Sequence, residues 1–169
     1  MVPFPEPART DDLRLLLLTY LDFYRDVVAA KVRGLTPAQM SHSCVGSGWT
    51  PAGLVTHLAY MERRWLQWGF LGEQVEDPWG DGGRDGWVAP SADPATLLER
   101  LHREGRRTRE IVLSHELTDL AATGGRFGTE QDTPQLQWIL LHVLQEYARH
   151  AGHLDIAREL ADGSVGKAG

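Results

Sequence analysis

The chain contains 169 residues, of which 42% are hydrophobic and 24% are charged, and its formal net charge is −6. This length and composition are typical of a globular protein with a substantial core, and we expect a single domain over residues 1–169, with its folded core at about residues 8–162. The acidic balance and the lack of a long run of Lys or Arg exclude the basic surface that binds phosphate backbones, so we expect no nucleic-acid partner.

Signals for secretion or membrane insertion are not found in the sequence. The N-terminal stretch, MVPFPEPARTDD, does not place an apolar segment after a basic one, as a signal peptide does. Apolar runs, such as the four leucines at 15–18, are far too short to span a bilayer. Cys44 is the single cysteine and cannot form an internal disulfide, which fits a reducing compartment. We therefore expect a cytoplasmic protein without a membrane partner.

Four amphipathic helices are predicted, at about residues 11–32, 51–70, 94–116 and 134–161. The first begins after Thr10, with acidic residues in its first turn. Each of the other three begins with a capping side chain followed by proline at the first helical position. These pairs are Thr50-Pro51, Asp93-Pro94 and Thr133-Pro134. No segment alternates as a strand does, so the fold class is all-α, and four long helices predict a four-helix bundle.

The long loop between the second and third helices, residues 72–92, is rich in Gly and Asp and contains Trp79 and Trp87. A loop of this length within one domain is often a functional lid or a crossover. The alternative is a solvated crossover whose tryptophans pack only for stability. The shorter loop at 34–48 contains His42 and Cys44, and we interpret the cysteine as a small buried hydrophobe, the common fate of this residue type.

Polar side chains lie on the apolar face of the last helix. At roughly 100° per residue, His142, Glu146, His150 and His153 fall within one arc. The same arc contains the apolar residues Ile139, Ala157 and Leu160. Burial of these polar groups without partners would cost several kcal/mol, on the order of 2–7 for each group. The pattern therefore predicts that something satisfies them.

A metal ion is one such partner. Glu146 and His150 are four residues apart, so both side chains can reach one ion. His57 lies on the core-directed face of the second helix, with Leu54, Met61, Trp65 and Trp68, and ligands from facing helices are how bundles hold metals. Two histidines and one carboxylate with a vacancy suit zinc, while nickel, iron or manganese are chemically permissible. The alternative is that these are ordinary hydrogen-bonded histidines and an i,i+4 contact.

The remaining histidines and tryptophans have less specific interpretations. His142 and His153 either orient a ligand or line the cavity. The other three histidines are interpreted as surface or loop residues, and three tryptophans as core candidates at helical spacing. These are His42, His102 and His115, and Trp65, Trp68 and Trp138.

Two blocks of sequence, SGWTPAGLVTHLAYMERRW at 47–65 and EYARHAGHLDIARE at 146–159, resemble the DinB-like, or YfiT-like, metalloenzyme superfamily over about residues 8–162. The resemblance implies a four-helix bundle whose metal ligands are His57, Glu146 and His150. Many relatives have histidine where Glu146 stands, and the mycothiol-dependent maleylpyruvate isomerases have glutamate. His153 stands where many relatives have glutamine, which implies a supporting role. Those isomerases carry a further C-terminal domain, so their specific activity is not expected here.

The resemblance implies a transferase or isomerase that uses a low-molecular-weight thiol such as mycothiol as cosubstrate, together with an electrophilic substrate. A divalent metal ion would activate the thiol as a thiolate. Arg64 lies near the His57 face and either binds a carboxylate of the thiol or substrate, or is a solvated arginine at a helix end. Two other functions stay open. One is a metal-binding or small-molecule-binding stress protein without catalysis. The other is a metal-assisted hydrolase, but the only carboxylate on the site face is Glu146, which is already assigned as a metal ligand and so is not available as a base. A homodimer is also left open.

Overall fold

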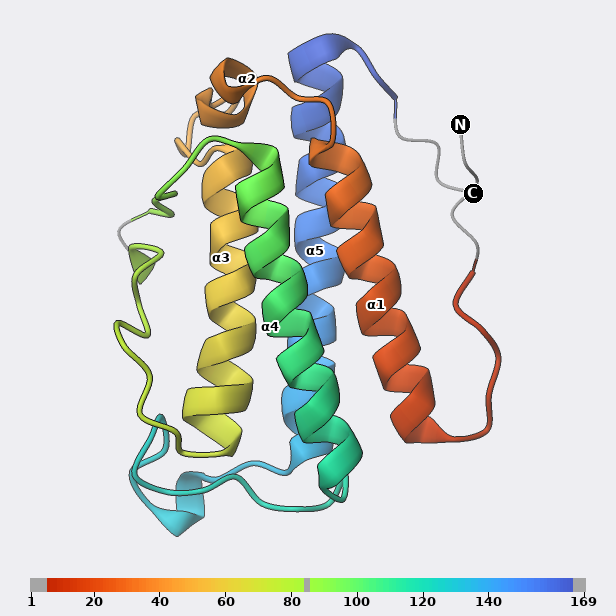
Figure 1. Cartoon of the computed structure of the whole chain (residues 1–169), viewed down its shortest axis with the longest axis vertical. Helices are drawn as coiled ribbons and strands as arrows, with labels where there is room; N and C mark the ends of the chain where they lie inside the picture. The colour runs from red at the N-terminus through yellow and green to blue at the C-terminus, as the bar shows by residue number, and fades with distance from the viewer. Residues whose placement is uncertain (1–5, 84–85, 166–169) are drawn as a thin grey trace.

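A computed structural model describes residues 6–83 and 86–165, and the protein is an all-α bundle (Figure 1). Four long helices form the bundle, together with a short helix and two irregular helical turns. In chain order the elements are α1 (Leu13–Val32), α2 (Pro37–Ser41), α3 (Pro51–Arg63), the π-helix η1 (Arg64–Phe70), α4 (Pro94–Ser114), the 3₁₀-helix η3 (Glu130–Asp132) and α5 (Leu136–Asp162). Helix η1 continues α3, so the second predicted helix is confirmed over its full length.

The long helices are arranged so that α1 and α3 each pack against both α4 and α5. In Figure 1, α3 and α4 run in the same direction, whereas α1 and α5 run in the opposite direction. The segment at 71–93 must therefore return along the whole length of α3 before α4 can begin, a distance of about 30 Å for helices of this size. The long predicted loop is therefore a crossover, which runs along the outer side of α3 (Figure 1).

The interior of the bundle is apolar and contiguous. Leu58 of α3 and Leu140 of α5 are fully buried, as the helical period predicts. The predicted apolar arc of the last helix is confirmed at Ile139 and Ala157 but is wrong at Leu160, which is 59% exposed. Because α5 has 27 residues and α1 has 20, the last turn of α5 extends past the end of α1 and has less to pack against (Figure 1).

The helix starts test the capping predictions. Thr50 and Asp93 cap α3 and α4, each with proline at the first helical position. The start of α1 differs slightly, because Asp12 is itself the cap and accepts hydrogen bonds from the backbone of Arg14 and Leu15, so no acidic residue lies in the first turn.

The predicted start of the last helix is wrong, because α5 begins at Leu136 rather than at Pro134. An isolated bridge between Leu120 and Gln135 holds the preceding residues extended. The first amides of α5 donate to backbone carbonyls of this neighbouring segment, with Leu136 N bonded to Asp119 O. These carbonyls replace the side-chain cap that Thr133 was predicted to provide.

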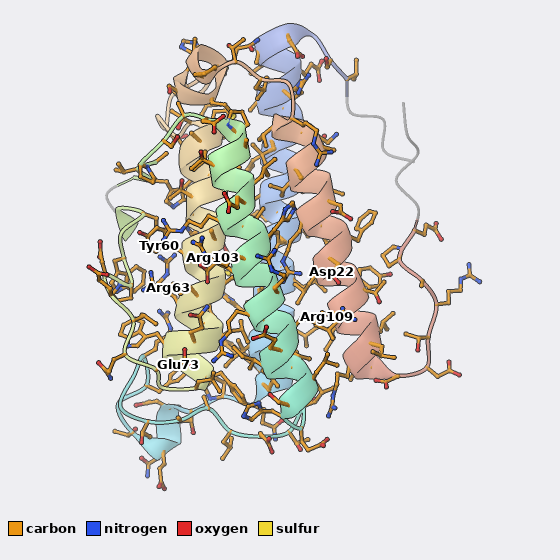
Figure 2. All side chains as sticks on the ribbon, in the orientation of Figure 1. Asp22, Tyr60, Arg63, Glu73, Arg103 and Arg109 are labelled. Carbon is orange, nitrogen blue, oxygen red and sulfur yellow. The ribbon has the colours of Figure 1, made fainter. Side chains whose placement is uncertain are left out.

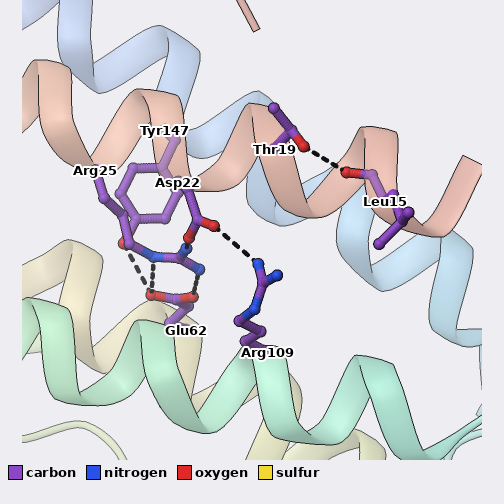
Figure 3. A network of polar contacts seen from close by, with 7 residues as sticks. All are labelled: Leu15, Thr19, Asp22, Arg25, Glu62, Arg109 and Tyr147. Carbon is purple, nitrogen blue, oxygen red and sulfur yellow. Dashed lines mark hydrogen bonds and ion pairs between the residues drawn. The ribbon is translucent and has the colours of Figure 1, made fainter. Parts of the chain in front are cut away.

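A buried ion pair joins three of the long helices next to the candidate site (Figure 3). Arg25 of α1 binds both carboxylate oxygens of Glu62 on α3, and the hydroxyl of Tyr147 on α5 donates to the same carboxylate at 2.9 Å. All three side chains are buried. Tyr147 follows Glu146 directly, so this network fixes the turn of α5 that carries the candidate ligands.

Within the described part of the chain, none of the helices combines the length and the apolar character needed to cross a membrane.

Candidate metal centre

Three potential metal donors meet where α3 packs against α5. His57 comes from α3, and Glu146 and His150 come from consecutive turns of α5. One ligand atom of each lies within 4.8 Å of the others. The Oε2 atom of Glu146 is 3.2 Å from Nε2 of His150 and 3.6 Å from Nε2 of His57. The three residues that the sequence singled out are therefore brought together.

The imidazole of His57 is oriented by a carboxylate from the crossover. Its Nδ1 lies 3.0 Å from Oδ2 of Asp81, whose side chain is fully buried. The guanidinium of Arg64 binds the same carboxylate, with Nη1 at 2.6 Å from Oδ1 and Nη2 at 3.1 Å from Oδ2. Burial acts to raise the pKa of Asp81, but the hydrogen bonds from His57 and Arg64 outweigh it and lower that pKa. Because the carboxylate is ionised and can only accept, Nδ1 of His57 carries a proton, and in the neutral imidazole Nε2 then has a lone pair available for a metal ion.

That lone pair has no hydrogen-bond partner. Among the described residues, Nε2 of His57 is buried without a donor or acceptor, and the 3.6 Å separation from Glu146 is too long for a hydrogen bond. Buried polar atoms without a partner are rare in proteins. A cation between His57 and the two donors of α5 would satisfy this atom, and two nitrogens and one carboxylate oxygen form a donor set that divalent transition metals accept. The residues present therefore fit a metal ion.

Neighbouring groups determine the protonation and orientation of the three candidate donors. Burial acts to lower the pKa of His57, but the hydrogen bond to Asp81 and the nearby carboxylate of Glu146 raise it overall. The hydrogen bond from His150, followed by the close approach of His57, holds the pKa of Glu146 far below its ordinary value, so this side chain is a carboxylate. His150 is 3% exposed, and its Nδ1 lies 3.1 Å from Nδ1 of His153. His153 thus contacts the imidazole of His150 on the side away from Glu146.

Aromatic rings close the site on the side of the crossover. Trp87 stacks on His57 with ring centres 4.3 Å apart, and its ring is nearly perpendicular to that of His150, with ring centres 4.9 Å apart. A cavity of about 560 Å³ adjoins this indole, and Trp49 forms another part of its wall. Ser47, Gly48, Gly83, Gly86 and Val88 also line it. None of the described residues that line the cavity carries a charged side chain.

Several other predicted residues occupy different environments. Arg64 is not solvated, because it is 4% exposed and paired with Asp81. Trp138 is 52% exposed rather than a core residue, and its ring stacks on that of His142. Cys44 is half-buried in the loop before α3. Of the histidines predicted to lie on the surface, His42 is exposed, whereas two are half-buried, namely His102 and His115.

Sequence reasoning missed Asp81, the carboxylate that holds both His57 and Arg64. Its only signal is a lone acidic residue between glycines in the segment DPWGDGG, where no period indicates which way a side chain points. Arg126, between α4 and α5, was missed for the same reason.

Comparison with known proteins agrees with this architecture. A search among curated proteins found no match. The model of the mycothiol S-transferase family, which is DinB-like, matches residues 16–163. This match includes the four long helices almost entirely and all three candidate metal ligands. The chain therefore belongs to the mycothiol S-transferase family.

Proposed function

We propose that this protein is a metal-dependent S-transferase that joins a low-molecular-weight thiol, with mycothiol as the first candidate, to an electrophilic substrate. His57, Glu146 and His150 would hold a divalent ion, with zinc as the expected metal and nickel, iron or manganese as alternatives. The observation that carries the proposal is the buried, unpartnered Nε2 of His57, directed at a carboxylate and an imidazole of α5.

The donor set supports catalysis rather than a purely structural ion. Among the described residues the cluster contains three donors, whereas structural zinc sites are closed by four. His153 or His142 would have to complete the set. Nδ1 of His153 is directed at Nδ1 of His150 instead, and the ring of His142 stacks on that of Trp138. When bound, a divalent ion with an open position supplies a Lewis acid that lowers the pKa of a thiol, so that the nucleophilic thiolate is available at neutral pH.

The protein's own residues would then position the reactants. Asp81 holds the proton of His57 at Nδ1 and fixes the ring. Trp87 covers both imidazoles and limits the access of water to them. The adjoining cavity, with its glycine backbone and indole walls, is large enough for a sugar-bearing thiol. In the transfer, the thiol proton would pass to water, and the sulfur would form a bond to the electrophilic carbon, from which a leaving group departs with its electron pair.

Hydrolysis receives less support from the same contacts. A hydrolase needs a general base for its water nucleophile. Asp81 adds a second carboxylate to the site, but it is fully buried and already binds His57 and Arg64. Glu146 is shared between the two histidines. No carboxylate of the described cluster is therefore free to accept a proton from water.

Metal analysis combined with thiol titration tests the proposal. Purified wild type, His150→Ala and the exposed control His42→Ala are analysed for metal content, before and after reconstitution with zinc, nickel, iron and manganese. We expect about one ion per chain in the wild type and the control, and a loss of metal in His150→Ala. Mycothiol should then bind only to the metal-loaded protein. If none of the four metals binds stoichiometrically to the wild type, the proposal is wrong.

A further inference from the structure

Arg126, outside the candidate metal centre, is enclosed by tryptophan rings. Its guanidinium carbon lies 4.1 Å from the centre of the Trp65 ring and 5.6 Å from that of Trp79. The backbone amide of Arg126 donates to the carbonyl of Trp68 at 3.1 Å, which anchors the connection between α4 and α5 to η1. The side chain passes over Gly69, where a Cβ would lie 3.6 Å from Cδ of Arg126. The position of the guanidinium is thus fixed by packing.

In the described part of the chain, no carboxylate balances the positive charge of Arg126. Across residues 6–83 and 86–165, no acidic side chain forms an ion pair with Arg126, and its half-buried guanidinium makes no hydrogen bond to a protein side chain. Burial, and then the charge of Arg64, lower the pKa of Arg126, and no acidic group acts in the opposite direction. Arg64 differs in this respect, because it also faces the Trp79 ring, at 4.5 Å, but is neutralised by Asp81. A partly desolvated cation without a partner is costly, and an anionic ligand would remove that cost.

One of the rings that contact Arg126, that of Trp65, also lies next to the helix that carries two of the candidate metal ligands. The ring of Trp65 lies 4.4 Å from that of His142, which is one helical turn from Glu146 on α5. The cavity lined by Trp49 and Trp87 lies toward the opposite end of α5, where these indoles contact His153 and His150. Along α5, Glu146 and His150 therefore lie between the Trp65 ring that contacts Arg126 and the indoles that line the cavity.

We propose that Arg126, which contacts the rings of Trp65 and Trp79, binds a carboxylate of the electrophilic substrate, while the cavity beside Trp87 receives the thiol. This inference rests on the proposed S-transferase function and specifies the substrate class, an electrophile that carries a carboxylate. The planar fork of a guanidinium matches a carboxylate with two parallel hydrogen bonds. Contacts with two tryptophan rings hold that fork in place, so little side-chain entropy is lost when the anion binds.

A matched pair of electrophiles tests the assignment. Iodoacetate and iodoacetamide share a reacting carbon, and in both the sulfur–carbon bond forms as iodide leaves with its electron pair and the thiol proton passes to water. All proteins carry Cys44→Ser, so that the added mycothiol is the only thiol. In Arg126→Gln we expect kcat/KM for iodoacetate to fall about tenfold to a hundredfold, with iodoacetamide changed less than about twofold. Arg126→Lys, which keeps the charge but not the fork, should retain an intermediate rate.

The control is Arg109→Gln on the outer face of α4, where Arg109 pairs with Asp22 of α1 (Figure 2). It should leave both rates unchanged. An equal loss with both electrophiles, or no loss with either, overturns the assignment of Arg126. If the KM for mycothiol rose with both electrophiles, Arg126 would act on the thiol rather than on the electrophile, and the assignment would also be wrong. Thermal unfolding of each variant shows whether it is folded.

A binding measurement separates this inference from the proposed function. Propanoate and propanamide have no leaving group, and their binding is followed through the indole NMR signals of Trp65 and Trp79. In the wild type we expect propanoate, but not propanamide, to shift these signals. The shift should be lost in Arg126→Gln and kept in Arg109→Gln. If the wild type transfers thiol to neither iodo compound but binds propanoate in this way, the transferase function fails and the anion site stands. If propanoate shifts the signals of Arg126→Gln as it does those of the wild type, the anion site is wrong.

Discussion

Nδ1 of His57 on α3 and the buried carboxylate of Asp81 in the crossover lie 3.0 Å apart, so a loop residue orients a candidate ligand on a helix. The other side of the same carboxylate binds Arg64, also on the α3–η1 helix. Partners of this kind hold a metal-binding imidazole in one tautomer and one orientation. The crossover therefore contributes to the site through a side chain that does not itself belong to the donor cluster.

Asp81→Asn should weaken metal binding by about 10- to 100-fold, because the amide leaves Arg64 without its anion and no longer fixes the proton of His57. Competition with a chelator of known affinity measures the effect. Glu76→Gln, an exposed acidic residue of the same crossover, is the matched control and should bind metal as the wild type does. Equal affinities in Asp81→Asn and Glu76→Gln would contradict the role given to Asp81.

A second prediction concerns His153, whose Nδ1 lies 3.1 Å from Nδ1 of His150. Burial, followed by the charges of His150 and Arg149, lowers the pKa of His153, which favours the neutral ring that can accept a hydrogen bond from His150. His153→Gln offers an amide oxygen in its place and should keep metal affinity within a few-fold, whereas His153→Leu should lose about tenfold. Isothermal titration with zinc distinguishes the two variants. A leucine variant as tight as the glutamine variant would show that the contact is not used.

How far the site could be predicted from the sequence depends on where its residues lie. His57, Glu146 and His150 are on long helices, and the helical period fixes which face each occupies, so their meeting could be predicted before the bundle was seen. Asp81 and Arg126 are in connections between helices, where neither residue spacing nor hydrophobicity indicates direction. Their partners became evident only from the three-dimensional contacts with His57 and Trp65.

The fold shows the same division. Capping pairs correctly marked the starts of α3 and α4, because Thr50 and Asp93 act on the amides that follow them. The pair at Thr133 failed, because a distant backbone segment supplied the acceptors for α5. Trp138 and Leu160 failed as core residues because both lie near the ends of α5, where burial depends on how far the neighbouring helices extend.

The cap of α4 predicts a dependence of stability on pH. Hydrogen bonds from the side chain and then the backbone of Thr96 lower the pKa of Asp93 below its ordinary value near 3.8. A carboxyl group whose pKa is lower in the folded state stabilises the fold above its unfolded pKa, and this contribution is lost as the pH falls through the folded pKa. Asp93→Asn still caps the helix but cannot titrate. Urea unfolding between about pH 2 and 5 should therefore show a smaller loss of stability on acidification in the variant than in the wild type. Parallel curves for the two proteins would contradict this.

Two glycines within helices should respond to alanine in opposite directions. Gly105 of α4 lies against the buried guanidinium of Arg25, and a Cβ there would be 2.6 Å from its Nε atom. Arg25 cannot move away freely, because it is bound to Glu62 (Figure 3). Gly105→Ala should therefore reduce the free energy of unfolding by about 1–3 kcal/mol.

Gly152 of α5 is the matched control, because a Cβ at this exposed position would meet nothing within 4 Å. Alanine has the higher helix propensity, so Gly152→Ala should raise the free energy of unfolding by roughly 0.5–1 kcal/mol. Chemical denaturation at neutral pH measures both changes. If Gly105→Ala were as stable as Gly152→Ala, the Arg25–Glu62 pair would have to tolerate displacement. The close approach of α4 to α1 could then not be what fixes the position of the Arg25 side chain.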